Sequence, residues 1–237
     1  MGHVTPAVAI TIGVDIGQRA DPSAIVVAEQ LPGDRHRIHR IERIALQTAY
    51  PQVAERLAAV YNATVARLID LQAAEERRTG VAIDRLSKDF EPSHDAKFLR
   101  ASACVYVMVD ATGCGLPVVD FLRESAGIAE GHLTGVMFTA GSGINVRRGA
   151  RDGTVSKSHL VSRLQSLLGF GRLEWPKSAA ARELADELED FELSVNDNAT
   201  PQWGARAGKH DDLVCAAALA VLIGGNAHKF TCESYID

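Results

Sequence analysis

Apolar residues in the first third of the chain follow a strand pattern and then a helix pattern. Two apolar runs, at 8–14 and 24–28, flank a turn that contains glycine and proline, which is typical of two antiparallel strands. Apolar and polar residues alternate at 37–46, which predicts a third strand. Residues 50–78 place apolar side chains at spacings of three and four, as in a long amphipathic helix. Three antiparallel strands followed by a helix therefore open the predicted fold.

The rest of the chain alternates predicted strands with predicted helices. Residues 104–109 are continuously apolar and end at Asp110, as expected of a central strand that is buried on both faces. The other segments are strands at 133–139 and 172–175 and helices at 116–125, 156–170, 178–191 and 209–225. This order predicts an α/β fold with a mixed sheet, in which three antiparallel strands are followed by parallel strands, flanked by helices.

A chain of 237 residues, 46% of them hydrophobic, is expected to bury one sizeable core, so we expect a single domain over 1–237. Residues 80–101 mix charges with scattered apolar residues and are predicted to be an insertion or extended loop. Glycines and basic residues at 140–157 predict an exposed loop or projecting hairpin. Residues 201–210 are expected to be a glycine-rich loop, with His210 a helix-start residue rather than a base.

Composition argues against several classes of protein. No apolar run approaches the roughly 20 residues that span a bilayer, and the first residues lack the layout of a signal peptide, so we expect a cytoplasmic protein. The four cysteines show no C-x-x-C spacing, which argues against a zinc site or a disulfide framework. The formal net charge of −5 argues against a wholly basic nucleic-acid binder but permits a local basic patch.

Acidic side chains lie at the ends of two predicted strands. Asp15 is near the end of the first strand, in a core-facing run where a carboxylate is costly unless something pairs with it. Asp110 ends the central strand, and open α/β sheets bind ligands at these carboxyl ends. Gly13 and Gly17 are expected to leave room for an anionic ligand to approach the backbone. A cap of its own turn would explain Asp15 equally well.

Two further acids open the apolar helix predicted at 209–225. A helix cap explains either Asp211 or Asp212, but not both at the head of one buried helix. We expect this helix to aim Asp212 at the strand ends that carry Asp15 and Asp110. Three carboxylates from two strand ends and a helix start predict a hard-oxygen site for Mg²⁺ or Mn²⁺.

A basic segment interrupts the otherwise acidic chain. Between residues 145 and 177 there are seven positive and two negative residues, a local balance of +5 on a chain of −5. Lysine and arginine contacts to phosphates supply most of the sequence-independent affinity for nucleic acid. We therefore expect Arg147, Arg148, Arg151 and Lys157 to hold a nucleic-acid backbone, with a solvated surface loop as the alternative.

The acidic positions stand in three motifs with a characteristic order. Asp15 in GVDIG, Asp110 in YVMVDATGCG and Asp212 in KHDDLVCAAALAV resemble the acidic motifs of the ribonuclease H-like nucleases. Within that superfamily, residues 10–224 are most similar to the nuclease domain of the large terminase subunit of tailed bacteriophages. That family also has an acid shortly after the first motif, matched by Asp21, and a lysine-containing segment, matched by residues 155–175.

Two departures from the family pattern change what we expect. The chain lacks the G-x-x-x-x-G-K-[ST] phosphate loop of the packaging motor, so we expect either an excised domain or a stand-alone nuclease. Cys215 stands where related junction resolvases often carry a further acid. Metal binding by the third motif would then fall to Asp212, with help from Asp211.

The resemblance implies a ribonuclease H-like fold and a metal-dependent endonuclease that hydrolyses DNA phosphodiesters, as terminases do in phage genome packaging. It implies a two-metal mechanism in which Asp15 bridges two Mg²⁺ or Mn²⁺ ions, and Asp110 and Asp212 each complete one shell. Asp21 and Asp211 are expected as outer or alternative ligands. The expected partners are double-stranded DNA and the ATPase motor and portal of a phage, in the cytoplasm of a bacterial host.

Other functions are compatible with the same acids. A Holliday-junction resolvase-like nuclease would share them but would act as a dimer on four-way junctions. A non-catalytic phage assembly module would use them only as caps while docking on a portal or motor. An actin-like ATPase also opens with a G-x-D-x-G strand, but it needs a second phosphate-binding loop that the sequence does not show.

Overall fold

The computed structural model describes residues 9–17, 21–79, 104–128, 131–141, 143–195, 201–206 and 209–223. The insertion expected at 80–101 lies outside the described residues, and it stays a prediction together with the single-domain organisation. None of the described helices combines the length and the apolar character needed to cross a membrane.

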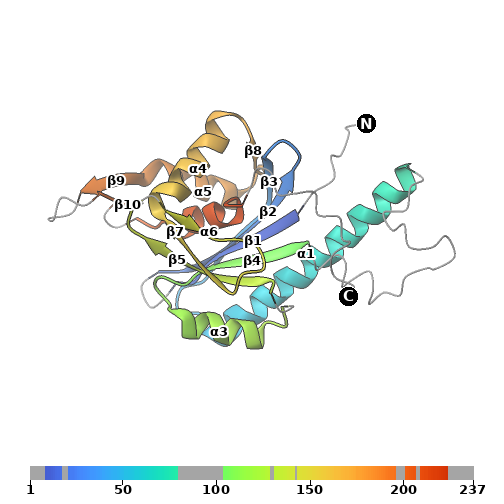
Figure 1. Ribbon diagram of the computed structural model, residues 1–237, viewed down its shortest axis with the longest axis horizontal. Coiled ribbons are helices and arrows are strands. Elements are labelled where there is room, and N and C mark those ends of the chain that lie inside the picture. The colour runs from blue at the N-terminus through green and yellow to red at the C-terminus, as the bar shows by residue number, and fades with distance from the viewer. Residues whose placement is uncertain are drawn as a thin grey trace.

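Eight strands form one mixed sheet in the order β6-β7-β5-β4-β1-β2-β3-β8 (Figure 1). Their bounds are β1 (Ala9–Asp15), β2 (Ser23–Leu31), β3 (Arg35–Ile44), β4 (Val105–Asp110), β5 (Leu133–Thr139), β6 (Ile144–Asn145), β7 (Asp152–Ser156) and β8 (Leu173–Glu174). β1, β2 and β3 pair antiparallel, whereas β1, β4, β5 and β7 run parallel to one another. The short edge strands are β6, antiparallel to β7, and β8, parallel to β3. This arrangement confirms the predicted mixed sheet.

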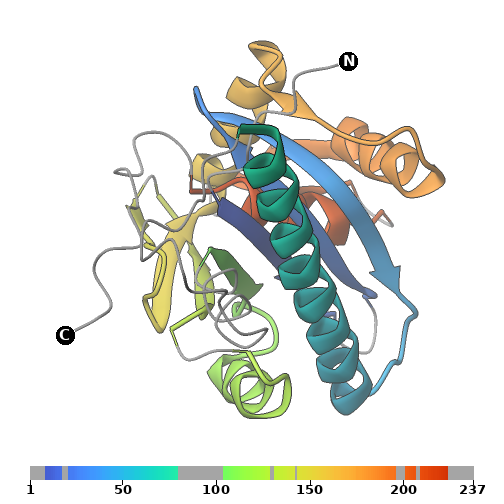
Figure 2. The ribbon, with the colours of Figure 1, turned by 90° about the vertical axis from the view of Figure 1, so that its right-hand side faces the viewer.

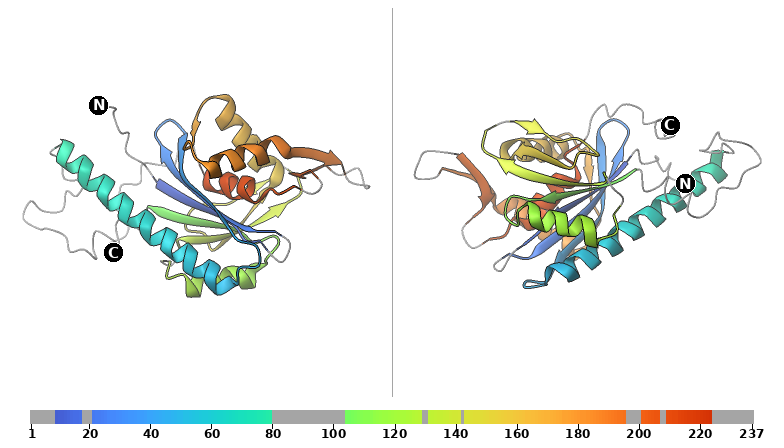
Figure 3. Two further views of the ribbon diagram at one scale, coloured as in Figure 1. Left: turned by 180° about the vertical axis from the view of Figure 1, so that it is seen from behind. Right: turned by 60° about the horizontal axis from the view of Figure 1, so that its bottom comes forward.

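Helices cover both faces of the sheet (Figures 2 and 3). On one face lie α1 (Tyr50–Thr79) and α3 (Leu116–Ser125). On the other face lie α4 (Lys157–Gly169), α5 (Ala179–Asp190) and α6 (Asp212–Ala220). Each of these helices matches one predicted from the spacing of apolar residues, although several ends differ by a few residues.

A second, two-stranded sheet projects from one end of the molecule (Figure 1). β9 (Phe191–Val195) follows α5 directly, and β10 (Pro201–Ala205) pairs with it antiparallel. The expectation of a glycine-rich loop at 201–210 is therefore wrong for 201–205. Proline and glycine indicate a turn by local preference, but pairing with the preceding strand β9 holds this segment extended and outweighs such preferences.

Side chains of β1 and β2 alternate between two cores. Ile10, Ile12 and Val14 of β1 are fully buried in the core formed with α1 and α3. Ala24 and Ala28 of β2 pack in the other core, with α4, α5 and α6. Because these alanines are small, the apolar helix α6 lies close to the sheet.

Helix α6 approaches the main chain of the sheet at Gly13 in β1. A Cβ atom on this residue would lie 2.0 Å from the carbonyl oxygen of Ala216 and 2.6 Å from the amide nitrogen of Ala220. At Gly17 a Cβ would lie 2.0 Å from the carbonyl oxygen of Asp21, within its own turn. The expected room for an anionic ligand beside these glycines is therefore absent, because the backbone of the chain itself occupies it.

Arginines from other elements hold the carboxyl end of α6, which has no basic residue in its own last turn. Arg163 of α4 donates from Nε to the carbonyl oxygen of Val221 (3.1 Å), and Arg148 donates from Nη2 to that of Ile223 (3.2 Å). The Arg163 guanidinium also donates twice to Asp34 in the β2–β3 turn (2.5 and 2.6 Å). Positive groups stabilise the carbonyl end of a helix, so these contacts anchor α6 to the rest of the fold.

We expect Gly13→Ala to destabilise the protein, because the added methyl group would meet main-chain atoms of α6 that cannot rotate aside. Overpacking of a core costs about 1–3 kcal/mol or more, and we expect a loss of at least about 3 kcal/mol in the free energy of unfolding in urea. Gly169→Ala is the matched control, since a Cβ there meets nothing within 4 Å. Equal stability of Gly13→Ala and the wild type would contradict the close contact.

Candidate metal centre

Acidic residues from three elements meet at one edge of the sheet. β1 and β4 are parallel neighbours with Val14 opposite Val109, so the residues that follow, Asp15 and Asp110, lie side by side at the carboxyl ends. Helix α6 packs across both strands and begins at Asp212. The fold thus brings Asp15, Asp110 and Asp212 to the same end of the sheet, where the charges of Asp110 and Asp212 act on Asp15.

Burial and mutual repulsion make the ionised state of these carboxyl groups costly. The pKa of Asp15 is raised well above its usual range, first by burial and then by the negative charges of Asp110 and Asp212. Burial also raises the pKa of Asp110, although the amide of Thr112, which donates to Asp110 Oδ1 at 2.7 Å, opposes this rise. A cation placed among these groups would offset both effects.

The Asp212 side chain has an orphaned oxygen. The residue is only 4% exposed, and its Oδ2 accepts no hydrogen bond from any residue that the structure describes. Burial, followed by the negative charge of Glu187, raises the pKa of Asp212 to about 6. A buried carboxylate oxygen without a donor is unfavourable unless a cation pairs with it. The residues present therefore fit a divalent metal ion here.

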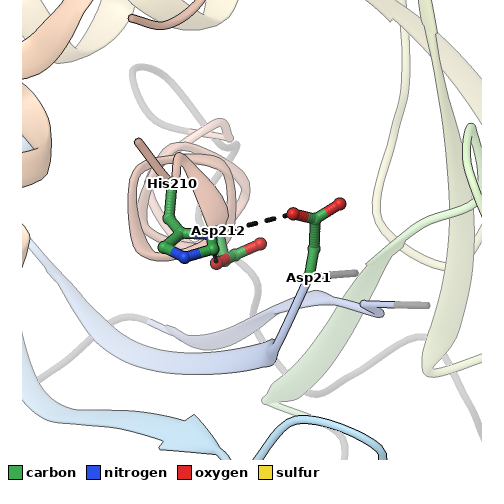
Figure 4. Close-up of side chains that lie close together, drawn as sticks. All are labelled: Asp21, His210 and Asp212. Carbon is green, nitrogen blue, oxygen red and sulfur yellow. Dashed lines mark ion pairs between the residues drawn. The ribbon is translucent and has the colours of Figure 1, made fainter. Parts of the chain in front are cut away.

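Asp21 and His210 complete a candidate ligand set around Asp212 (Figure 4). His210 Nδ1 lies 3.7 Å from Asp21 Oδ1 and 3.8 Å from Asp212 Oδ2. One potential ligand atom from each of the three residues lies within 4.8 Å of the other two. The expectation that His210 is only a helix-start residue overlooks this position, because its approach to Asp21 depends on the β1–β2 turn. The H-x-D spacing of His210 and Asp212 at the start of α6 is a sequence signal that could have indicated His210 as a ligand.

The amides at the start of α6 are capped from another helix. Glu187 of α5 accepts hydrogen bonds at Oε2 from the amides of Leu213 (2.9 Å) and Val214 (3.2 Å). Asp211 occupies the N-cap position, but its side chain makes no capping hydrogen bond. A helix cap therefore does not explain Asp211. The role of Glu187 leaves no signal in the sequence, since 26 positions separate it from Leu213.

The four basic residues predicted to hold nucleic acid do not form one patch. Lys157 follows the carboxyl end of β7, and its Nζ lies 3.5 Å from Asp211 Oδ2, beside the acids. Arg147, Arg148 and Arg151 all precede β7 and therefore lie toward the opposite edge of the sheet. At about 3.3 Å per strand residue, the main chain from Arg151 to Lys157 spans about 20 Å.

The three arginines also differ in their contacts. Arg148 is half-buried and donates from Nη2 to Gln30 in β2. Arg151 is 67% exposed and pairs with Asp120 of α3 at 2.6 Å. Arg147 is exposed and forms no ion pair within the described part of the chain. Arg147 and Arg151 thus present charge to solvent, whereas the charge of Arg148 is used inside the fold.

No protein-family model matches the sequence, and no curated protein matches it significantly. Solved structures do match. The large terminase nuclease from thermophilic phage G20c with bound magnesium has a TM-score of 0.54 and 19% sequence identity, over 90% of this chain and 80% of that chain. The same nuclease with bound cobalt has a TM-score of 0.55 and 20% sequence identity, again over 90% of this chain and 80% of that chain. The nuclease domain of the large terminase subunit of bacterial virus Sf6 gives 0.50 at 11% identity, over 90% of this chain and 87% of that chain.

Together with the strand order, these similarities define the class of fold. The chain has the mixed α/β, ribonuclease H-like fold that the sequence predicts. More particularly, it has the fold of the nuclease domain of phage large terminase subunits, the family that its acidic motifs resemble.

Without divalent metal, we expect the free energy of unfolding to fall as the pH rises from about 4 to about 6. The pKa of Asp212 is about 6 in the folded protein against an ordinary value of 3.8, so the folded state binds this proton more tightly than the unfolded state. The stabilisation is complete below pH 3.8 and is lost as the pH rises through 6. Asp212→Asn should therefore be more stable than the wild type at pH 7, by about 1–3 kcal/mol.

Urea unfolding in EDTA across this pH range measures both effects. Glu183→Gln, which neutralises an exposed acid on α5, is the control and should leave the pH dependence unchanged. An Asp212→Asn variant that is less stable than the wild type at pH 7 would contradict the cost assigned to the buried carboxylate.

Proposed function

We propose that the protein is an endonuclease that hydrolyses DNA phosphodiesters with divalent metal ions. The observation that carries the proposal is the acidic set at one sheet edge, in which half-buried Asp15 and Asp110 lie near buried Asp212, whose Oδ2 has no hydrogen-bond donor in the described structure. Carboxylates so arranged suit Mg²⁺ or Mn²⁺. The fold shared with a terminase nuclease that was solved with magnesium and with cobalt supports the proposal.

Each acidic side chain has a proposed role in a two-ion site. Asp15 would contribute to the shells of both ions, and Asp110 and Asp212 would each complete one of them. Asp21 and His210 would join Asp212 as ligands. The His210 ring lies within ion-pair distance of both carboxylates, and one potential ligand atom of each residue lies within 4.8 Å of the other two. Bound divalent ions supply an activated water and stabilisation of the leaving 3′ oxygen.

Lys157 would act within the site. Its ammonium group lies 3.5 Å from Asp211 Oδ2 and 5.8 Å from the ring centre of Phe138. A positive charge beside the acids offsets part of their repulsion, and in the proposed reaction it would contact the phosphate that is cleaved. Asp211, paired with Lys157, would serve as an outer or alternative ligand.

The terminase-like fold supports double-stranded DNA as the substrate, with the packaging motor and portal of a phage as partners. Arg147 and Arg151 would contact the DNA backbone away from the cleaved bond. The roughly 20 Å of main chain between Arg151 and Lys157 corresponds to about six base pairs of duplex at about 3.4 Å each. Such backbone contacts give affinity without reading the base sequence.

We expect the protein to nick and linearise supercoiled plasmid with Mg²⁺ or Mn²⁺, and not in EDTA. Asp15→Asn and Asp212→Asn should abolish both products, because each variant keeps the side-chain shape but loses a charged ligand. Glu183→Gln should cleave like the wild type. Agarose gel electrophoresis of the plasmid forms over time measures the rates.

Other outcomes of this experiment would identify the alternatives. A well-folded wild type that cleaves in neither metal, and is not stabilised by Mn²⁺ against heat, would contradict the proposal and favour a docking module. Metal-dependent cleavage of four-way junctions in preference to linear duplex would instead indicate a resolvase-like nuclease.

Lys157→Ala and Arg147→Ala should separate catalysis from DNA binding. Arg147→Ala should weaken binding to all sequences alike and reduce the slope of log affinity against log salt by about 1, with cleavage at saturating DNA unchanged. Lys157→Ala should lose most of its cleavage even at saturating DNA. Fluorescence anisotropy with labelled duplex, beside the plasmid assay, measures both. If Lys157→Ala cleaves normally at saturating DNA, Lys157 is an ordinary phosphate contact.

A further inference from the structure

The first amides of a helix lack partners within the helix, and the group that caps them determines which nearby side chains stay free. In α6 the amides in question belong to Leu213 and Val214, the second and third helical residues. A side chain in the position of Asp211 ordinarily accepts hydrogen bonds from these two amides. In this protein Oε2 of Glu187 accepts from both of them.

Glu187 is held firmly in this place. It lies on α5 and is only 8% exposed. Its second oxygen, Oε1, accepts a hydrogen bond from Nη2 of Arg43 in β3. Burial raises the pKa of Glu187, and the Arg43 guanidinium and the amides of Leu213 and Val214 oppose this rise. Glu187 therefore links β3, α5 and the first turn of α6.

The cap from α5 leaves the acids of α6 free for other contacts. Asp211 Oδ2 lies 3.5 Å from Lys157 Nζ and makes no capping hydrogen bond. Asp212, one residue on, keeps Oδ2 without a donor in the described structure. Glu187 thus occupies the two amides that an Asp211 cap would use.

We infer that Glu187 is a positioning residue of the metal centre. By capping α6 in place of Asp211, it keeps the Asp211 and Asp212 carboxylates at the strand ends beside Asp15. Its effect on metal binding rests on the proposed function, whereas its effect on the conformation of Asp211 does not. A contact that merely stabilised the helix would have no influence on which acid faces the site.

Crystal structures of Glu187→Ala and Glu187→Gln test the inference without metal or DNA. In Glu187→Ala, we expect the Asp211 carboxylate to rotate onto the amides of Leu213 and Val214 and to leave Lys157. In Glu187→Gln, the single amide oxygen should keep the cap at the loss of the bond from Arg43, and Asp211 should stay on Lys157. The inference is overturned if Asp211 remains paired with Lys157 in Glu187→Ala.

Calorimetric titration with Mn²⁺ tests the consequence for the site. Loss of a residue that orients metal ligands typically costs 10–100-fold in affinity, and we expect Glu187→Ala to bind Mn²⁺ at least about tenfold more weakly. Glu187→Gln should regain most of the affinity. Leu184→Ala is the matched control, because it removes a fully buried side chain from the same helix without touching the cap. Well below its melting temperature it should bind Mn²⁺ like the wild type.

The outcomes separate the possible failures. Equal losses of affinity in Leu184→Ala and Glu187→Ala would show that only stability matters and would overturn the inference. If Glu187→Ala does not fold, Glu187→Asp replaces it, since a side chain shorter by one methylene retracts from the two amides. If the wild type binds no Mn²⁺, the proposed function fails, while the position of Asp211 in the crystal structures still decides the inference.

Discussion

The contact between helix α6 and strand β1 is the constraint on which the candidate site depends. Gly13 lets the main chain of the helix lie against the strand, but apolar packing alone is non-directional and would let a helix of alanine and leucine slide. Polar anchors prevent this: Glu187 holds the amino end, and Arg163 and Arg148 hold the carboxyl end. The position of Asp212 relative to the strand ends therefore follows from groups that lie on other elements.

The ionised acidic cluster lowers the stability of the folded protein when no cation is bound. Burial and like charge raise the pKa of Asp15, Asp110 and Asp212 together, and strongly perturbed groups of this kind concentrate at functional sites. A bound cation would turn the repulsion into attraction, so binding would stabilise the folded protein by mass action. Lys157 already provides one positive charge at this edge. Repulsion among the carboxylates thus couples the stability of the fold to its proposed chemistry.

The direction of the parallel strands separates the basic residues by position in the sheet. Lys157 comes after β7 and reaches the acids, whereas Arg147, Arg148 and Arg151 come before it and do not. Arg148 shows why a local excess of positive charge is an incomplete guide to a binding surface. Its guanidinium counts toward the basic segment, yet it bonds Gln30 and the carbonyl end of α6.

Much of the fold is predictable from the sequence alone, because apolar periodicity is a local property that survives folding. It predicts the mixed sheet and the five helices of the described structure, although residues 152–156, expected in an exposed loop or hairpin, form β7 of that sheet. It marks Asp15 and Asp110 as candidates because a carboxylate that ends an apolar strand is costly unless something pairs with it. The resemblance of the motifs to terminase nucleases points to the fold that the structural comparisons share.

Tertiary structure alone decided the contacts that complete the site. Glu187 caps a helix 26 positions away, and Arg148 reaches Gln30 across 118 positions, so neither contact leaves a local pattern. Gly13 similarly signals freedom of the backbone in the sequence, but only the packed helix shows that this space is filled. His210 becomes a candidate ligand only once the β1–β2 turn brings Asp21 beside it. The sequence by itself determined most of the elements and the candidate acids, because these depend on local patterns, and long-range packing determined how those acids lie relative to one another.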